Sequence, residues 1–206
     1  MKKIMFNDRY GLTQAVIEGR KTMTRRFIPD EFFGLTWDTR GDTLVYENEY
    51  GDFIDVRHSK YTRYKVGEVV AVAQRYQDIF DYSNCVNPYD WEDDDKPSGW
   101  TNKMLTKAEL MPHRILITGI KCERLQDISD ADCIKEGIFV NEYVGNGKKC
   151  HHYGFDGFFD ETAGWFARGW YNTPREAFAS LIDKVSGRGT WGLNPWVVVY
   201  EFELVK

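Results

Sequence analysis

The sequence has few features that would tie it to a membrane, a metal ion or an oxidising compartment. Its four cysteines are Cys85, Cys122, Cys133 and Cys150, and no two of them form a C-x-x-C pair. No apolar run is long enough to span a bilayer, and charged residues interrupt the apolar residues near position 1. We therefore expect a cytoplasmic protein with reduced thiols, no membrane contact and no cofactor.

The only local cluster that suggests zinc is Cys150-His151-His152. A tetrahedral site needs a second pair of ligands at a suitable spacing, and the sequence does not supply one. We interpret the cluster as part of a polar loop and expect no metal site.

An excess of positive charge is also missing. The chain has 27 Lys and Arg residues against 32 Asp and Glu residues, a formal charge of -5 and a pI near 5.5. A protein that coats a nucleic acid through its phosphates normally carries the opposite sign. Any contact with a nucleic acid must therefore be local, through a small basic cluster and a pocket.

Aromatic residues are plentiful. Hydrophobic residues make up 42% of the chain and aromatic residues 16%, with seven Trp, twelve Tyr and thirteen Phe. Such side chains suit pleated, half-buried surfaces, so the composition favours β structure. We expect a mostly β fold with short flanking helices, of the α+β class.

Alternating and periodic segments follow one another without a linker or an internal repeat. This order indicates one domain, residues 1–206, with insertions near residues 36–58, 78–102 and 140–171. The surest helix begins at the capping box Thr173-Pro174-Arg175-Glu176 and ends near Gly187. We expect strands at residues 2–7, 69–76, 114–124 and 196–205, and short helices at residues 9–18 and 129–137.

The most distinctive local feature is the run of residues 19–26, GRKTMTRR. It holds four cations and two hydroxyls just beyond a predicted helix end. Arg offers a planar fork to phosphate or carboxylate, and Lys offers a point charge. The run is either an anion-binding loop or a solvated basic turn that balances an acidic protein.

Gly19, Lys21, Thr24 and Arg26 match a G-x-K-x-x-T-x-R pattern, and the chain is similar to the ASCH domain family of the PUA-like superfamily. Further blocks resemble phage-type and gut-bacterium-type members in the same order. They are Tyr64-Lys65-Val66-Gly67-Glu68, Met111-Pro112-His113-Arg114-Ile115, residues 123–128, Glu136-Gly137-Ile138, Trp191, Asn194-Pro195-Trp196-Val197 and Tyr200-Glu201-Phe202. The resemblance implies a β-barrel with a cleft lined by the basic motif, and binding of RNA or a nucleotide.

A branch of that family removes the acetyl group from N4-acetylcytidine with a Lys, a Thr and a Glu. The resemblance carries the first two roles to Lys21 and Thr24, and the Glu position falls on Gln74. An amide can neither give nor take up a proton near neutral pH, although it can bind the edge of a base. Gln74 therefore favours binding over catalysis.

Three functions remain open. The leading prediction is a domain that binds RNA, a nucleoside or a nucleotide through Lys21, Thr24, Arg25, Arg26 and Gln74, with Trp191 and Asn194 as further candidates. The second is an amidohydrolase in which Lys21 and Thr24 are catalytic. The third is a module that binds a partner protein through the acidic residues 90–95 and the aromatic residues 153–171.

Overall fold

The computed structural model describes residues 1–28, 36–38, 43–80, 96–145, 148–156 and 170–205. The strands are β1 (Lys3–Ile4), β2 (Met23–Phe27), β3 (Thr36–Asp38), β4 (Thr43–Glu47), β5 (Phe53–Asp55), β6 (Val69–Val72), β7 (Arg114–Arg124), β8 (Phe139–Gly145), β9 (Lys148–Gly154) and β10 (Trp196–Val205). The α-helices are α1 (Leu12–Ile17), α2 (Tyr76–Ile79), α3 (Asp130–Lys135), α4 (Pro174–Ser186) and α5 (Thr190–Leu193). This content confirms the α+β class.

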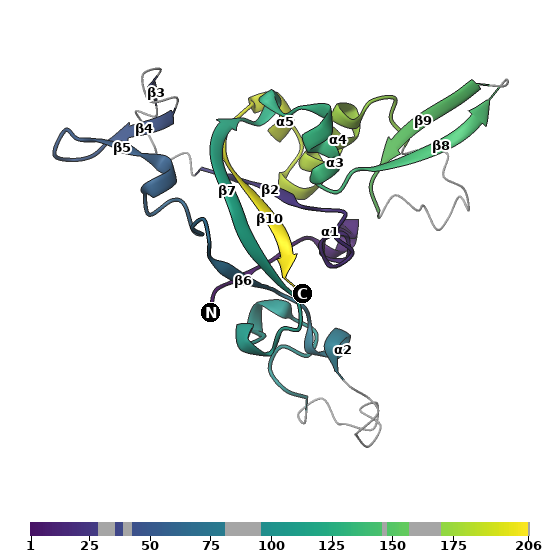
Figure 1. The fold of residues 1–206 in the computed structure, drawn as a ribbon, viewed down its shortest axis with the longest axis horizontal. Coiled ribbons are helices and arrows are strands. Elements are labelled where there is room, and N and C mark those ends of the chain that lie inside the picture. Colours follow the sequence, from purple (N-terminus) through teal and green to yellow (C-terminus); the bar gives the residue numbers. More distant parts are fainter. Residues whose placement is uncertain (29–35, 39–42, 81–95, 146–147, 157–169, 206) are drawn as a thin grey trace.

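A five-stranded sheet forms the centre of the molecule, in the order β1-β6-β7-β10-β2 (Figure 1). The long strands β7 and β10 pair antiparallel from Trp196↔Arg124 to Val205↔Arg114, with a bulge between Glu201 and Phe202. Strand β1 is parallel to β6, and β2 is antiparallel to β10. Both long strands carry alternating apolar residues, which is the pattern expected where a sheet covers a core.

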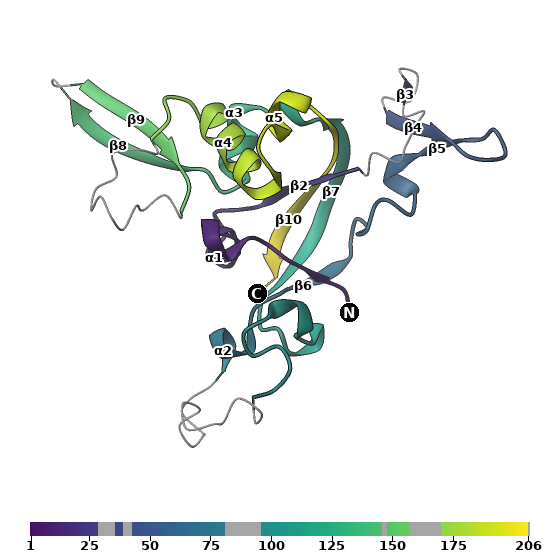
Figure 2. The same ribbon diagram turned by 180° about the vertical axis from the view of Figure 1, so that it is seen from behind.

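Helices α3, α4 and α5 lie together beside β2 and β7, and α1 lies at the end of β2 (Figures 1 and 2). Local signals set their bounds. The hydroxyl of Thr173 accepts a hydrogen bond from the Glu176 N–H and begins α4, and the hydroxyl of Ser129 accepts one from Asp132 and begins α3. Both caps were predicted. Phe178 and Leu181 of α4 are buried in the main core against β10.

Two of the three predicted insertions form sheets of their own. Strands β3, β4 and β5, within the insertion predicted near residues 36–58, form an antiparallel meander. Strands β8 and β9, within the insertion predicted near residues 140–171, form a hairpin that projects from the helical side (Figure 1). Cys150 and its histidines lie on β9 and not in a loop.

Other parts of the predicted insertions lie outside the described residues. These are residues 81–95, with the acidic stretch 90–95, and residues 157–169. The acidic stretch and most of the aromatic segment therefore remain predictions.

The described strands do not close into the expected barrel. Strands β1 and β2 are the two edges of the central sheet, and no backbone pairing joins them within the described part of the chain. A side chain connects them instead, because Nη2 of Arg26 donates to the carbonyl of Met5 at 2.6 Å. The sheet is therefore open between the end of β1 and β2.

Two further observations concern membranes and metals. Within the described ranges, no helix has the length and apolar character needed to cross a bilayer. The same ranges contain no group of three or more His, Cys, Asp or Glu side chains placed to hold a metal ion.

Candidate functional site

A cavity of about 310 Å³ lies at the gap between the two edges of the central sheet. The residues after β1, strand β2 and helix α4 all contribute to its wall. The apolar part includes Phe6, Leu12, Phe178 and Leu181, and the polar part is Lys21, Thr24, Arg25, Arg26 and Glu136. Four of the predicted site residues therefore line one concavity, together with a carboxylate that the sequence analysis did not select.

The position of Lys21 follows from the end of α1. Gly19 has φ 75°, a conformation that favours glycine, and the chain then turns so that Lys21 N–H donates to the carbonyl of Ala15. The Lys21 side chain is only 2% exposed. Lys21, Thr24 and Arg25 of the basic run are thus buried, whereas Arg20 and Arg26 are exposed.

All three protons of the Lys21 ammonium have acceptors. Nζ donates to the carbonyl of Met23 at 2.7 Å, to the carbonyl of Glu136 at 2.7 Å and to Oε2 of Glu136 at 2.5 Å. These three contacts fit the charged form, in which all three N–H groups donate. No Lys21 donor remains for a ligand in this geometry, and direct contact with a phosphate would require one of these bonds to break.

Burial nevertheless acts against the charge. It lowers the pKa of Lys21, and the charges of Arg25 and Arg26 act in the same direction, while Glu136 opposes them. The Lys21 ammonium is therefore a stronger acid than an ordinary lysine. This property suits a group that must release a proton inside the cavity.

Arg25 belongs to an ion-pair network that also includes Glu136. Its Nη1 donates to Oε1 of Glu136 at 2.9 Å, and its Nη2 donates to Oε1 of Glu123 at 2.6 Å. Burial alone would lower the pKa of Arg25, but these two carboxylates raise it. Arg25 was predicted to bind a ligand, whereas its contacts show that it holds the Glu136 carboxylate in place.

Thr24 is the polar residue of the wall that lacks a partner. It is 5% exposed and lines the cavity, and its hydroxyl forms no hydrogen bond with any described residue. Arg26 is exposed and uses one N–H on the Met5 carbonyl, so its other donors face the cavity and the solvent. A ligand would therefore find a free hydroxyl and a guanidinium.

Glu136 is the site residue that the sequence analysis missed. It follows α3 directly, where the helix dipole disfavours a negative charge. An acid at that place needs a cation, and Lys21 and Arg25 supply two. The sequence did contain a signal for this residue: a Glu directly after a well-capped helix needs a cation, and the basic motif of residues 19–26 could supply one.

Gln74 does not line this cavity. It follows β6, is buried, and accepts at Oε1 from Nδ1 of His113 at 2.8 Å in the tautomer that donates there. Its backbone N–H faces the sulfur of Met111. The expected place of Gln74 at the floor, beside Lys21 and Thr24, is not supported by this geometry.

Trp191 and Asn194 also lie outside the cavity wall. The indole of Trp191 packs edge-to-face on Phe178, with ring centroids 6.1 Å apart, and Arg175 lies over its other side. Asn194 has φ 46° and accepts at Oδ1 from the N–H of Gln126. Both residues connect α5 to neighbouring elements, and Trp191 packs against Phe178, which lines the cavity.

The cavity thus combines an apolar wall, a partner-free hydroxyl, an accessible guanidinium and a buried lysine–glutamate pair. Comparison with protein-family models, with curated proteins and with solved structures finds no match for this chain.

Proposed function

We propose that the protein is an ASCH/PUA-like domain whose cavity binds the base of a nucleoside, either free or within RNA. The observation that carries this proposal is Thr24, a 95% buried threonine whose hydroxyl has no described hydrogen-bond partner on a cavity wall. Among the described residues, the only fully enclosed side-chain polar atom without a partner is the Thr43 hydroxyl, so the Thr24 hydroxyl is open to the cavity and to a ligand there. A barrel opened at β1 and β2 leaves room for that ligand.

The chemistry of the wall suits a flat, polar heterocycle. The wall offers apolar contact from Leu12, Ile182 and Val185, and Thr24 and Arg26 offer donors at the edge of a base. The volume of about 310 Å³ lies at the lower end of the range for small-molecule sites. The ligand would therefore be a single nucleoside unit and not a folded nucleic acid.

Isothermal titration with a panel of nucleosides tests this proposal. Thr24→Val removes the hydroxyl and keeps the shape, so affinity should fall about tenfold, the value of one good hydrogen bond. Thr106→Val is the matched control, because Thr106 is also a buried threonine but does not line the cavity. Equal affinities for the wild-type protein and Thr24→Val would refute the proposed role of the cavity.

A second candidate is hydrolysis of an N4-acylated cytosine, and Glu136 is the observation that favours it. The hydroxyl oxygen of Thr24 would attack the acyl carbon and lose its proton to Glu136. The Lys21 ammonium would give up its hydrogen bond to the Met23 carbonyl and protonate the departing amine as the C–N bond breaks. Glu136 would then return a proton to Lys21 across their 2.5 Å contact, and water would hydrolyse the acyl-threonine ester.

Release of acetate from N4-acetylcytidine tests this candidate. Turnover should disappear in Thr24→Val and in Glu136→Gln, and it should persist in Gln74→Ala because Gln74 does not line the cavity. Binding without acetate release from the wild-type protein would leave only the binding function. Loss of turnover in Gln74→Ala, with turnover kept in Glu136→Gln, would refute the role of Glu136.

A further inference from the structure

A second concentration of positive charge lies between Asp55 and Glu68. We call residues 57–65 the basic segment. It carries Arg57, Lys60, Arg63 and Lys65 together with His58, and it contains no Asp or Glu. In a chain with a net charge of -5, such a stretch is a strong local departure from the mean.

Hydrogen bonds hold the backbone of the basic segment in place. The hydroxyls of Ser59 and Thr62 both donate to the carbonyl of Val56, at 2.8 and 2.6 Å. The N–H of Arg63 donates to the hydroxyl of Tyr200 on β10 at 3.0 Å. The charged side chains therefore project from a fixed backbone, which reduces the entropy lost when a ligand binds.

Several of these cations are not neutralised. The side chain of His58 is 82% exposed, and Arg63 and Lys65 are exposed. Neither Arg63 nor Lys65 forms an ion pair with a carboxylate of the described chain. Arg57 differs, because Asp55 binds its guanidinium at 2.7 Å. The charges available to an external anion are thus those of Arg63, Lys65 and Lys60, of which Lys60 lies over the Tyr61 ring.

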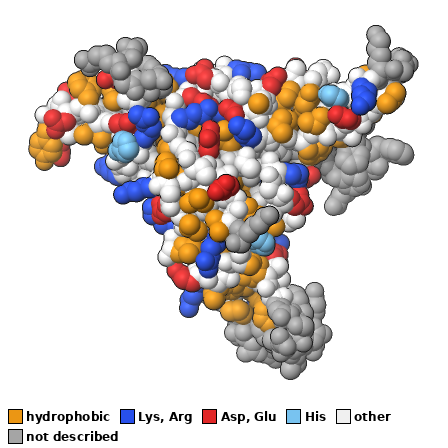
Figure 3. Space-filling view, in the orientation of Figure 1, with side chains coloured by type: hydrophobic (Ala, Val, Ile, Leu, Met, Phe, Trp, Pro, Cys, Tyr) orange, Lys and Arg blue, Asp and Glu red, His pale blue; other side chains and the backbone are white. Residues whose placement is uncertain are grey.

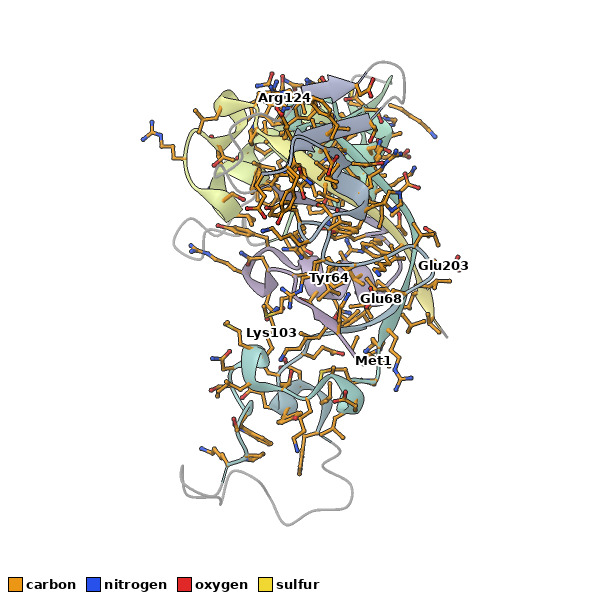
Figure 4. All side chains as sticks on the ribbon, turned by 90° about the vertical axis from the view of Figure 1, so that its left-hand side faces the viewer. Met1, Tyr64, Glu68, Lys103, Arg124 and Glu203 are labelled. Carbon is orange, nitrogen blue, oxygen red and sulfur yellow. The ribbon has the colours of Figure 1, made fainter. Side chains whose placement is uncertain are left out.

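The basic segment also walls a cavity of about 510 Å³. Arg57, His58 and Lys65 line this cavity together with Ser59, Thr62, Val66 and Ile120, and none of the described lining residues is a carboxylate. Figure 3 shows Lys and Arg side chains gathered on the left flank, over the part of the chain between β5 and β6. Figure 4 views this side directly and places Tyr64 and Glu68 at mid-height of the molecule.

The basic segment reaches toward the Lys21 cavity through Arg63. The N–H of Arg63 donates to the hydroxyl of Tyr200 on β10, and Tyr200 is the register partner of Thr24 on β2, which lines that cavity. The guanidinium of Arg63 lies over the ring of Tyr64, and Tyr64 packs on Tyr200. The basic segment is therefore attached to the strand that pairs with the cavity wall.

We propose that the basic segment, chiefly Arg63 and Lys65, binds the phosphodiester backbone of a single-stranded RNA whose base enters the Lys21 cavity. The identity of the base rests on the proposed function, whereas the phosphate contacts rest on the exposed cations alone. Single-stranded RNA fits this arrangement better than a duplex, because an unpaired base can leave the backbone and enter a pocket. Because the protein as a whole is negatively charged, we expect the RNA backbone to bind only along the basic segment.

Fluorescence anisotropy of a short labelled single-stranded RNA, measured over a range of salt concentrations, tests the proposal. Removal of both charges in Arg63→Gln/Lys65→Gln should weaken binding on the order of tenfold and reduce the salt slope by about 1.4, which is two phosphate contacts on a single strand. The matched control is Lys149→Gln/Arg188→Gln, which removes the same charges from exposed positions elsewhere and should change neither quantity.

A nucleoside and its 5′-monophosphate serve as further probes. The basic segment should contribute much less to the affinity for either of these probes than to the affinity for the RNA. If the charge change weakens the monophosphate as much as the RNA, the segment is a single-phosphate site and the backbone proposal is wrong. Equal salt slopes for the wild-type and Arg63→Gln/Lys65→Gln proteins overturn it as well, whatever the nucleosides do. If the slope falls but no nucleoside binds, the basic segment stands and the function proposed for the cavity fails.

Discussion

At the residue scale, the site is governed by buried groups that satisfy one another. Lys21, Arg25 and Glu136 share short contacts, and only Thr24 is left without a described partner. Removal of one member of such a network is costly because the others remain charged and buried. Conservative changes such as Thr24→Val and Glu136→Gln are therefore more informative here than changes to alanine.

Two buried thiols allow a prediction of pH dependence. Burial raises the pKa of Cys122 and of Cys133 from 9.0 to about 12. Above pH 9 the unfolded protein loses these protons and the native protein keeps them, so the free energy of unfolding should fall as the pH rises toward 12. Below pH 9 their stabilising contribution is fully present.

Urea unfolding from about pH 8 to about pH 11 measures this effect against a Cys122→Ala/Cys133→Ala variant. The variant has a lower stability at neutral pH because of the lost packing, but its stability should decline less steeply above pH 9. Parallel curves for the two proteins would contradict the assignment of the effect to these thiols.

At the element scale, the junction after α3 positions the site. Gly137 has φ 106°, and a Cβ at this position would lie 3.3 Å from Cδ2 of Leu12 and 3.6 Å from Cδ of Lys21. The absence of a side chain therefore permits the close approach of α3 to the Lys21 stem. Glu136 reaches Lys21 because of this glycine.

A pair of glycine substitutions separates backbone strain from crowding. Gly137→Ala and Gly187→Ala both place a side chain at positive φ, which costs about 1–2 kcal/mol. Only Gly137→Ala also crowds Leu12 and Lys21, since the nearest atom at Gly187 lies 3.9 Å away. We expect Gly137→Ala to be the less stable protein in thermal unfolding and the only one with weakened nucleoside binding. Equal effects on binding would show that the junction does not control the site.

The capped helices and the long strands could be predicted from the sequence, because caps and alternation are local signals. Thr173, Ser129 and the alternating residues 196–205 gave the correct elements. The pairing of Lys21 with Glu136 could not be read in this way, because it joins residues 115 positions apart. The sequence also did not predict where Gln74 lies. Near the end of a strand, a shift of one residue turns a side chain to the opposite face of the sheet.

At the scale of the whole molecule, the order of the strands concentrates stability in the centre. Strands β7 and β10 pair along their full length and contribute many core residues. The β8–β9 hairpin is a separate two-stranded sheet with exposed Val140, Tyr143 and Val144. Isolated hairpins are only marginally stable.

Hydrogen exchange followed by mass spectrometry should therefore show a gradient. Peptides from β7 and β10 should exchange last, near the rate of global unfolding, and peptides from β8 and β9 should exchange orders of magnitude faster. The Arg63→Gln/Lys65→Gln protein should show the same gradient, because these side chains are exposed. Equal protection of β8–β9 and β7–β10 would mean that the hairpin belongs to the central cooperative unit.

The pairing of β2 with β10 has a consequence for how the protein is made. The ribosome synthesises Thr24 and Arg26 early, but their only described strand neighbour is β10, at residues 196–205. In a nascent chain that lacks β10, strand β2 has no described strand to pair with, so the cavity wall that β2 contributes cannot form. Ligand recognition should therefore arise abruptly during translation, only after β10 has been made and has left the exit tunnel.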